Sequence, residues 1–400
     1  MLSLQKRRRK LPGNEINTAK SETKTGAAGM PRPFSLCKGL EREWAETAHT
    51  FPAPGNMQYA FRMSESKAFI SGCKGLTLTQ EERDFFAGER PWGFILFGRN
   101  IGEEEQIRDL VASLRESIGS PRAPVLIDQE GGRVQRIRPP LVQQYPNGAA
   151  IGEIYRRDRE LGLRAAWLMG RLHAFDLMRF GITVDCLPVL DVPVPGSHDV
   201  IGNRAYGHDP ATVTAIGRAM SEGLKAGGML PVMKHMPGHG RTFVDSHHNL
   251  PVVSAGLDEL KSSDFLPFAA MKDEAMAMSA HMVFTAIDPD NPATTSAKVV
   301  REIIRGHIGF DGLLMSDDVS MNALAGDMTA RAGGIIAAGL DLVLHCHGIM
   351  EEMKAVADVV PVLSGERLRR ARAAEAAFRE PDDAVEAALR AEFNAMFALA

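Results

Sequence analysis

The stretch LPVMKHMPGHGRTFVDSHHNLP, residues 230–251, gathers side chains that acid–base chemistry or metal binding would use. Lys234 and His235 follow a short apolar run that predicts a buried strand, and Asp245 and His247 come later in a polar loop. An Asp two positions before a His can fix the tautomer of the imidazole and favour its protonated form, as an acid/base pair requires. Histidines with a carboxylate can equally hold a metal ion. On these residues alone, both chemistries stay open.

The spacing between His235 and His239 resembles that of the zinc-binding HExxH helix. Pro237 and Gly238 lie between the two histidines. A proline inside a helix removes a backbone hydrogen bond and clashes with the preceding turn, at a cost of about 3 kcal/mol. A zinc helix is therefore excluded, and the segment is expected to be a turn.

Composition limits the classes of protein to consider. The 400 residues are 44% hydrophobic and 24% charged, with a formal net charge of -4, which argues against a nucleic-acid-binding protein. The four cysteines are far apart and form no CxxC pair, so a disulfide framework is not indicated and a reducing cytoplasm fits. No apolar run approaches the roughly 20 residues that span a bilayer.

The first 62 residues differ from the rest of the chain. They open with the basic run LSLQKRRRK, are rich in polar residues, Gly and Pro, and show no long hydrophobic period. No apolar segment follows the basic run, so a secretory signal is not indicated. We expect residues 1–62 to be a disordered or misassigned extension. Residues 63–400 are expected to form one catalytic domain.

From residue 63 on, short apolar runs that predict strands alternate with segments of helical periodicity. Predicted strands cover residues 93–97, 124–127, 182–190, 230–233, 275–279, 312–315 and 340–344. Predicted helices cover residues 101–118, 161–180, 210–227, 257–271, 299–308 and 329–338. Alternating strands and helices with right-handed crossovers imply a parallel sheet. Seven or eight units favour a single-domain (β/α)8 TIM-like barrel, with one or two extra C-terminal helices outside it after about residue 366.

Most predicted strands end in polar residues, each of which also has an ordinary structural explanation. Asp128 could cap a loop, and Arg136 could belong to a solvated face. Arg204 lies in a long loop, where an inward guanidinium could bind a ligand hydroxyl or carboxylate. Alternate residues of a strand point to opposite sides, so at most one of Asp317 and Asp318 should enter a site. If Asp317 enters, Asp318 points away, where it can cap a helix beginning near residue 319 or accept a structural hydrogen bond.

Five motifs occur together in one order along the chain. They are IDQEGGRVQR at 127–136, IGNRAYG at 201–207, KHMPGHG at 234–240, DSH at 245–247 and MSDDVSM at 315–321. This set resembles glycoside hydrolase family 3, in particular the bacterial cytoplasmic β-N-acetylhexosaminidases of the NagZ type. The resemblance covers residues 67–344, leaves out the N-terminal extension, and departs at Met236, where relatives often carry Phe.

The resemblance implies a role for each motif residue. Asp317, the first acid of the SDD motif, would be the nucleophile. His247 would be the general acid/base, supported by Asp245. The terminal sugar would be bound by Asp128, Arg136, Arg204, Lys234 and His235. This mechanism requires no metal and no cofactor.

The expected function is that of a retaining exo-β-N-acetylglucosaminidase. It would release terminal N-acetylglucosamine from muropeptides during peptidoglycan recycling in the cytoplasm. We expect a monomer without nucleic-acid or membrane partners. Three alternatives remain: a β-glucosidase or β-xylosidase, a metal-dependent hydrolase using His235, His239, Asp245 and His247, and a non-catalytic sugar-binding barrel.

Overall fold

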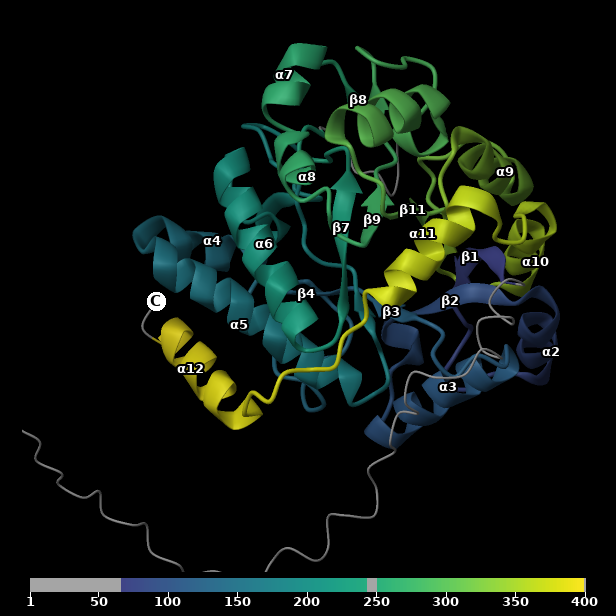
Figure 1. Ribbon diagram of the computed structural model, residues 1–400, viewed down its shortest axis with the longest axis horizontal. Coiled ribbons are helices and arrows are strands. Elements are labelled where there is room, and N and C mark those ends of the chain that lie inside the picture. Colours follow the sequence, from purple (N-terminus) through teal and green to yellow (C-terminus); the bar gives the residue numbers. More distant parts are fainter. Residues whose placement is uncertain (1–65, 243–249, 399–400) are drawn as a thin grey trace, which may run out of the picture. The chain divides into compact units, whose positions relative to one another are not determined.

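The computed structural model describes residues 66–242 and 250–398 (Figure 1). Within these ranges, eight parallel strands close into a barrel in the order β1-β12-β11-β9-β7-β6-β3-β2. The strands are β1 (Lys67–Ser71), β2 (Pro91–Leu96), β3 (Val125–Ile127), β6 (Val184–Asp185), β7 (Leu230–Met236), β9 (Met276–Ser279), β11 (Leu313–Asp318) and β12 (Leu342–His345). The predicted (β/α)8 barrel is confirmed.

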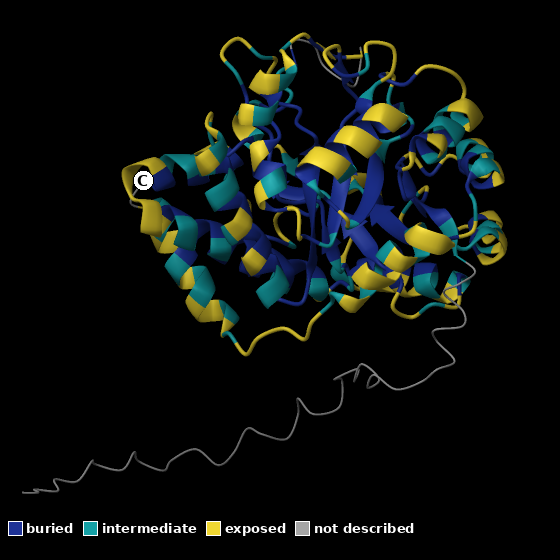
Figure 2. Cartoon of the chain, turned by 45° about the horizontal axis from the view of Figure 1, so that its top comes forward, coloured by how far each residue is buried: buried dark blue, intermediate teal, exposed yellow. Residues whose placement is uncertain are grey.

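Helices surround the barrel and expose their outer faces, whereas the strands inside are buried (Figure 2). These helices are α2 (Gln80–Glu89), α3 (Glu104–Ser117), α4 (Gly148–Arg157), α5 (Arg159–Met178), α6 (Pro210–Ala226), α7 (Leu257–Ser262), α8 (Leu266–Ala270), the π-helix η5 (Val299–Ile308), α9 (Met328–Ala338) and α10 (Met350–Val359). In α3 the apolar residues Ile107, Leu110 and Leu114 recur at helical spacing and are buried, as their periodicity predicts.

Two predicted elements are wrong in extent. The segment 257–271 forms two short helices, α7 and α8, instead of one. Pro267 lies in the first turn of α8, where its ring is tolerated, but it could not continue a helix arriving from α7. The predicted strand 182–190 shrinks to Val184–Asp185, with only a bridge from Val189 to Lys234 beyond it. Pro188 has no N–H to donate to a neighbouring strand.

Two C-terminal helices, α11 (Gly365–Ala376) and α12 (Glu386–Ala398), lie outside the barrel, as predicted (Figure 1). Helix α12 packs beside α5. Arg164 donates two hydrogen bonds of 2.7 Å to Glu392, and the buried Phe393 lies 5.9 Å from the ring of Tyr145. No helix in the described ranges is both long and apolar enough to cross a membrane. The predicted extension, residues 1–62, lies outside the described residues.

Short elements at the carboxyl ends of the strands carry many of the polar side chains. The hairpin β4 (Gln129–Gly131) and β5 (Val134–Gln135) follows β3, and η2 (Gly98–Asn100) follows β2. Farther along lie η3 (Gly202–Arg204), the strand pair β8 (Val252–Val253) and β10 (Val283–Phe284), and η4 (Ala293–Thr295). In a (β/α)8 barrel this end of the strands is where active sites are built.

Candidate active site

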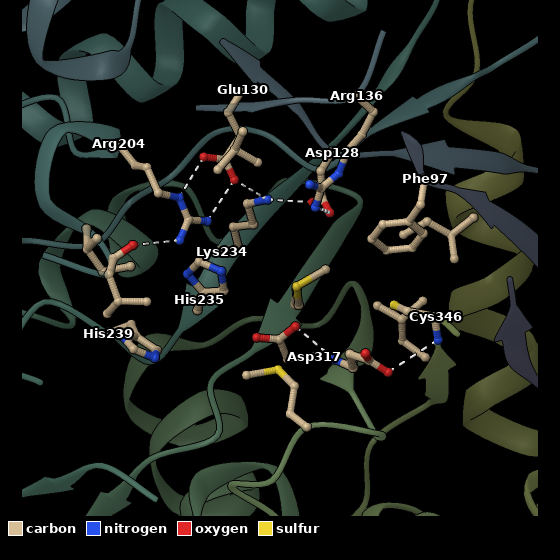
Figure 3. Close-up of a pocket in the computed structure, with 18 of the residues that line it drawn as sticks. Phe97, Asp128, Glu130, Arg136, Arg204, Lys234, His235, His239, Asp317 and Cys346 are labelled. Atoms are coloured by element: carbon tan, nitrogen blue, oxygen red, sulfur yellow. Dashed lines mark hydrogen bonds and ion pairs between the residues drawn. The ribbon is translucent and has the colours of Figure 1, made fainter. Parts of the chain in front are cut away.

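A cavity of about 360 Å³ opens at the carboxyl ends of the barrel strands. Six of the eight residues predicted for the site line it: Asp128, Arg136, Arg204, Lys234, His235 and Asp317 (Figure 3). They come from β7, β11, the end of β3, the β4–β5 hairpin and η3. Strands far apart in the sequence therefore bring these side chains together. Asp245 and His247 lie outside the described residues.

One wall of the cavity is a continuous network of ion pairs (Figure 3). The Nζ of Lys234 lies 2.8 Å from Oδ1 of Asp128 and 2.6 Å from Oε1 of Glu130. Arg136 donates to Oδ2 of Asp128 at 2.9 Å. Arg204 donates to both oxygens of Glu130, at 2.8 and 2.7 Å. The half-buried carboxylate of Asp128 and the buried carboxylate of Glu130 thus share three cations.

This network keeps its members charged. Burial alone would raise the pKa of Glu130, but the charges of Arg204 and Lys234 outweigh burial and lower it to about 2. The pKa of Asp128 is lowered further, because the charges of Lys234 and Arg136 likewise overcome its burial. Burial acts to lower the pKa of Lys234, and the two carboxylates raise it above its usual range. These groups are therefore fixed acceptors and donors for a polar ligand at neutral pH, not proton shuttles.

Asp191 contacts both histidines of the KHMPGHG motif. Its Oδ2 lies 2.7 Å from Nδ1 of His235, and its Oδ1 accepts the backbone N–H groups of His235 and His239, at 3.2 and 2.7 Å. Although Asp191 is buried, these neighbours lower its pKa to about 2. An ionised Asp191 makes Nδ1 of His235 the protonated nitrogen, so Nε2 is the nitrogen left for a ligand. The pKa of His239 falls to about 4, because of burial and the neighbouring His235.

Asp317 is the next-to-last residue of the barrel strand β11 and lines the cavity across from the ion-paired wall (Figure 3). Its Oδ1 accepts the backbone N–H of Asp318 at 2.8 Å, and no other described residue donates a hydrogen bond to this carboxylate. Burial would raise the pKa of Asp317. His235, His281 and the N–H of Asp318 outweigh burial and lower it, with a smaller contribution from Lys234. Arg204 pairs with Glu130 and not with Asp317. Asp317 is thus an ionised carboxylate with an oxygen that no described donor occupies.

Asp318 also lines the cavity, so the prediction that only one acid of the pair would enter the site is wrong. The register between β11 and β12 shifts after Met315, and such a bulge breaks the strict alternation of side chains. No helix begins near residue 319, because α9 starts at Met328. The alternative role is confirmed: Oδ1 of Asp318 accepts hydrogen bonds from Ser320 and from the N–H of Cys346, at 2.6–3.2 Å.

An apolar surface completes the cavity. It is formed by Ile95, Phe97, Met278, Met321, Leu344 and Cys346. The guanidinium of Arg136 lies over the ring of Phe97, 4.9 Å from its centre, so the polar and apolar walls meet there. A cavity with one charged wall and one apolar wall suits a ring that carries hydroxyls at its edge and C–H groups on its faces.

Comparison with known proteins identifies the family. Residues 70–379 match the sequence profile described as "Glycosyl hydrolase family 3 N terminal domain". The chain belongs to glycoside hydrolase family 3.

The names of proteins similar to this family 3 glycoside hydrolase agree with the group that its motifs indicate. A β-hexosaminidase of Aromatoleum aromaticum is 36% identical over 277 residues, which are 68% of this chain and 77% of the relative. The structure of NagZ from Neisseria gonorrhoeae in complex with N-trifluoroacetyl-D-glucosamine has a TM-score of 0.72 and 31% identity, covering 84% of this chain and 97% of that one. A family 3 β-N-acetylglucosaminidase from Paenibacillus sp. str. FPU-7 has a TM-score of 0.73 and 28% identity, covering 84% and 68%. The family predicted from the motifs is confirmed.

Sequence reasoning missed several groups of this family 3 site. Glu130 has no predicted role, yet it holds both Arg204 and Lys234. Asp191 has no predicted role either, yet it contacts His235 and His239. The available signal is position: Asp191 directly follows the predicted strand 182–190, and Glu130 lies two residues after Asp128 in the IDQEGGRVQR motif. The apolar wall has no such signal, since its residues resemble any other core positions.

The metal-dependent alternative draws on His235 and His239, whose ring centres are 5.5 Å apart. Within residues 66–242 and 250–398, no group of three or more His, Cys, Asp or Glu side chains is arranged to hold a metal ion. Asp245 and His247, which that alternative also needs, lie outside these ranges. Asp191 already holds Nδ1 of His235, which leaves one nitrogen of that ring available.

Proposed function

We propose that this glycoside hydrolase is a retaining exo-β-N-acetylglucosaminidase that uses Asp317 as its nucleophile. The observation that carries the proposal is the state of Asp317: ionised, in the cavity, and with a single hydrogen bond from the described residues. A carboxylate in this state can attack an anomeric carbon, because no strong donor ties up its second oxygen. The β-hexosaminidase and β-N-acetylglucosaminidase names of the relatives support the choice of sugar.

The reaction proceeds in two steps. In the first, an oxygen of Asp317 bonds to the anomeric carbon while the bond to the leaving oxygen breaks and that oxygen takes a proton from His247. In the second, His247 removes a proton from water, the water oxygen bonds to the anomeric carbon, and Asp317 departs as a carboxylate. Asp245 orients His247 and stabilises its protonated form. The roles of Asp245 and His247 rest on the DSH motif at 245–247.

The ion-paired wall binds the terminal sugar. Asp128 and Glu130 stay ionised and accept hydrogen bonds from sugar hydroxyls, while Lys234, Arg136 and Arg204 donate hydrogen bonds to hydroxyl oxygens. Nε2 of His235 faces the ligand because Asp191 holds Nδ1. Because these groups are already paired with one another, little reorganisation is needed when the sugar arrives.

The natural substrate that we propose is a muropeptide from peptidoglycan recycling. The protein would act in the cytoplasm as a monomer, with residues 63–400 as its catalytic domain. The resemblance of the motifs to bacterial β-N-acetylhexosaminidases of the NagZ type supports this choice, as does the similarity to NagZ.

Turnover of aryl glycosides tests the activity. We expect rapid hydrolysis of a nitrophenyl β-N-acetylglucosaminide and little of the matching glucoside or xyloside. Preference for the glucoside or xyloside would favour the alternative activities, and binding without turnover would favour a sugar-binding barrel. Activity should persist in metal-free buffer with a chelator, whereas its loss there would support the metal-dependent alternative.

The covalent step has its own test. A 5-fluoro N-acetylglucosaminyl donor that reacts slowly should add one sugar mass to the protein, and peptide mapping should find it on Asp317. Label on Asp318 would reverse the assignment. An inverted product with no covalent species would exclude the retaining mechanism.

A further inference from the structure

His281 is a buried histidine directly behind the pair of acids, and it has no part in the mechanism above. It lies two residues after β9 and is 0% exposed. Its Nε2 is 2.9 Å from the backbone carbonyl oxygen of Asp318, and its Nδ1 is 2.9 Å from Oγ1 of Thr294. His281 is not among the residues that line the cavity. It can therefore affect the cavity only through its hydrogen-bond partners.

The partners of His281 determine its tautomer. A backbone carbonyl can only accept, so Nε2 must carry a proton. Burial lowers the pKa of the ring, which favours the neutral form with Nδ1 unprotonated. Nδ1 lies beside Oγ1 of Thr294, a hydroxyl that donates to the carbonyl oxygen of Ala280 at 2.9 Å. Ser279 can in turn donate to Thr294, since their hydroxyl oxygens are 2.8 Å apart. A chain of buried hydroxyls thus fixes the direction in which the Nε2–H of His281 points.

The turn that receives this hydrogen bond also holds Asp317. The carbonyl oxygen of Asp318 accepts the N–H of Met321 at 3.1 Å as well as Nε2 of His281. The backbone N–H of the same Asp318 makes the one hydrogen bond to Asp317 from the described residues. A shift of the backbone at Asp318 would therefore move the donor that orients Asp317.

We propose that His281 is a positioning residue for the nucleophile, fixing Asp317 through the backbone of Asp318. The proposal rests on the proposed function, in which Asp317 attacks the sugar. His281 exchanges no proton with the substrate, because both of its nitrogens are engaged inside the protein. Its effect is geometric: it holds the reacting oxygen of Asp317 in line with the anomeric carbon, and small misplacements of reacting groups are costly to the rate.

Two polar substitutions separate a positioning role from a role in packing. In His281→Gln the side-chain amide reaches about as far as Nε2, so it can still donate to the carbonyl of Asp318. In His281→Asn the shorter amide reaches about as far as Nδ1, so it can contact Thr294 but not Asp318. Both variants keep a buried amide, and Ile335→Ala, a core truncation on α9 away from the cavity, controls for lost stability.

For His281→Asn we expect kcat to fall roughly ten- to a hundredfold, as for the loss of a buried hydrogen bond, with KM changed by less than about threefold. His281→Gln should recover most of kcat. The rate of labelling of Asp317 by the 5-fluoro donor should follow the same order, measured on folded protein. Ile335→Ala should melt at lower temperature but keep its kcat.

Two results would overturn the proposal. One is wild-type kcat and labelling rate in His281→Asn. The other is equal loss in both His281 variants, in step with their melting temperatures, as a packing role would give. If the proposed function itself were wrong, the 5-fluoro donor would label Asp317 neither in the wild-type protein nor in the His281 variants.

Discussion

The two sides of the cavity treat their carboxylates in opposite ways. On one side, Asp128 and Glu130 are each held by two cations, through contacts of 2.6–2.9 Å. On the other, the described residues give Asp317 one backbone N–H and no contact with a cation. All three are ionised at neutral pH. Charge alone therefore does not distinguish a binding carboxylate from a reacting one, and the number of bonds to its oxygens does.

The difference agrees with the roles that we propose for the two sides. A binding wall should not move, and paired buried charges resist movement, because separating them leaves each one desolvated without a partner. A nucleophile must form a new bond, and each strong donor on its oxygens would have to be weakened first. Asp317 is ionised chiefly by nearby groups, among them His235, that do not bond to it. In the proposed mechanism, Asp317 thus keeps its charge without losing its reactivity.

The largest effect is expected from neutralising Asp317, which tests the difference between the two sides of the cavity. In Asp317→Asn the reacting oxygen loses its charge, so turnover should fall by at least about 10⁴-fold, while the fold and much of the sugar binding remain. Asp318→Asn should keep measurable activity and lose mainly stability, because Oδ1 of Asp318 holds Ser320 and the N–H of Cys346. Steady-state kinetics, melting curves and binding of N-acetylglucosamine to both variants would check this. The comparison would be wrong if Asp318→Asn were the inactive variant.

The second prediction removes the cation at the centre of the binding wall. Lys234→Met keeps most of the side-chain volume but leaves Asp128 with Arg136 only and Glu130 with Arg204 only. Since the side chain of Lys234 is 2% exposed, we expect a loss of about 3 kcal/mol in unfolding free energy and a strongly raised KM. Denaturant unfolding and kinetics measure the two effects.

A matched control for this change lies on α6. Lys225 contacts Glu274 at 3.0 Å, is 22% exposed, and lies outside the cavity. Lys225→Met should cost at most about 1 kcal/mol, as partly exposed ion pairs do, with KM unchanged. Equal effects of the two variants would mean that the ion pairs of Lys234 contribute no more to stability and substrate binding than an ordinary, partly exposed ion pair.

The third prediction uses pH. The pKa of Glu130 falls from 4.5 to about 2 in the folded protein, so its ionised form contributes stability above pH 4.5 that is lost as the pH falls toward 2. Glu130→Gln should therefore be less stable than wild type at neutral pH, and its stability should fall less steeply with acid. Urea midpoints across this range would show the difference. An unchanged acid slope would contradict the assignment.

Glu375 offers a control of opposite sign. Burial raises its pKa to about 7, against the hydrogen bond of 2.7 Å that it accepts from Trp92. A raised carboxyl pKa means that stability is lost as the pH rises from 4.5 through 7. Glu375→Gln should thus gain stability relative to wild type at pH 8, where Glu130→Gln loses it.

Local patterns in the sequence predict the barrel, whereas the resemblance to glycoside hydrolase family 3 implies the six predicted site residues that line the cavity. Apolar runs alternate with helical periods, and a parallel barrel brings polar residues at the strand ends to one face. The partners behind these residues could not be predicted. Nothing in the spacing of Asp191 and His235, 44 residues apart, indicates that they touch at 2.7 Å. The bulge in β11 that turns Asp318 into the cavity likewise depends on pairing with β12.

The last prediction has the smallest expected effect and asks whether the N-terminal extension contributes to either wall. We propose that residues 1–62 are dispensable, since they lack a hydrophobic period and the barrel closes through β1, which starts at Lys67. Deleting them should change the unfolding free energy by no more than about 0.5 kcal/mol and leave kcat and KM unchanged.

The matched control extends the deletion through Ser71. This removes β1, which pairs with both β12 and β2, and with it the contact from the N–H of Leu363 to the carbonyl of Ser66. An opened barrel exposes unpaired strand edges and apolar core, so this longer deletion should not fold. If removal of residues 1–62 alone lowered kcat or raised KM, the extension would complete one wall of the cavity. A loss of stability with unchanged kinetics would instead mean that it packs on the barrel away from the site.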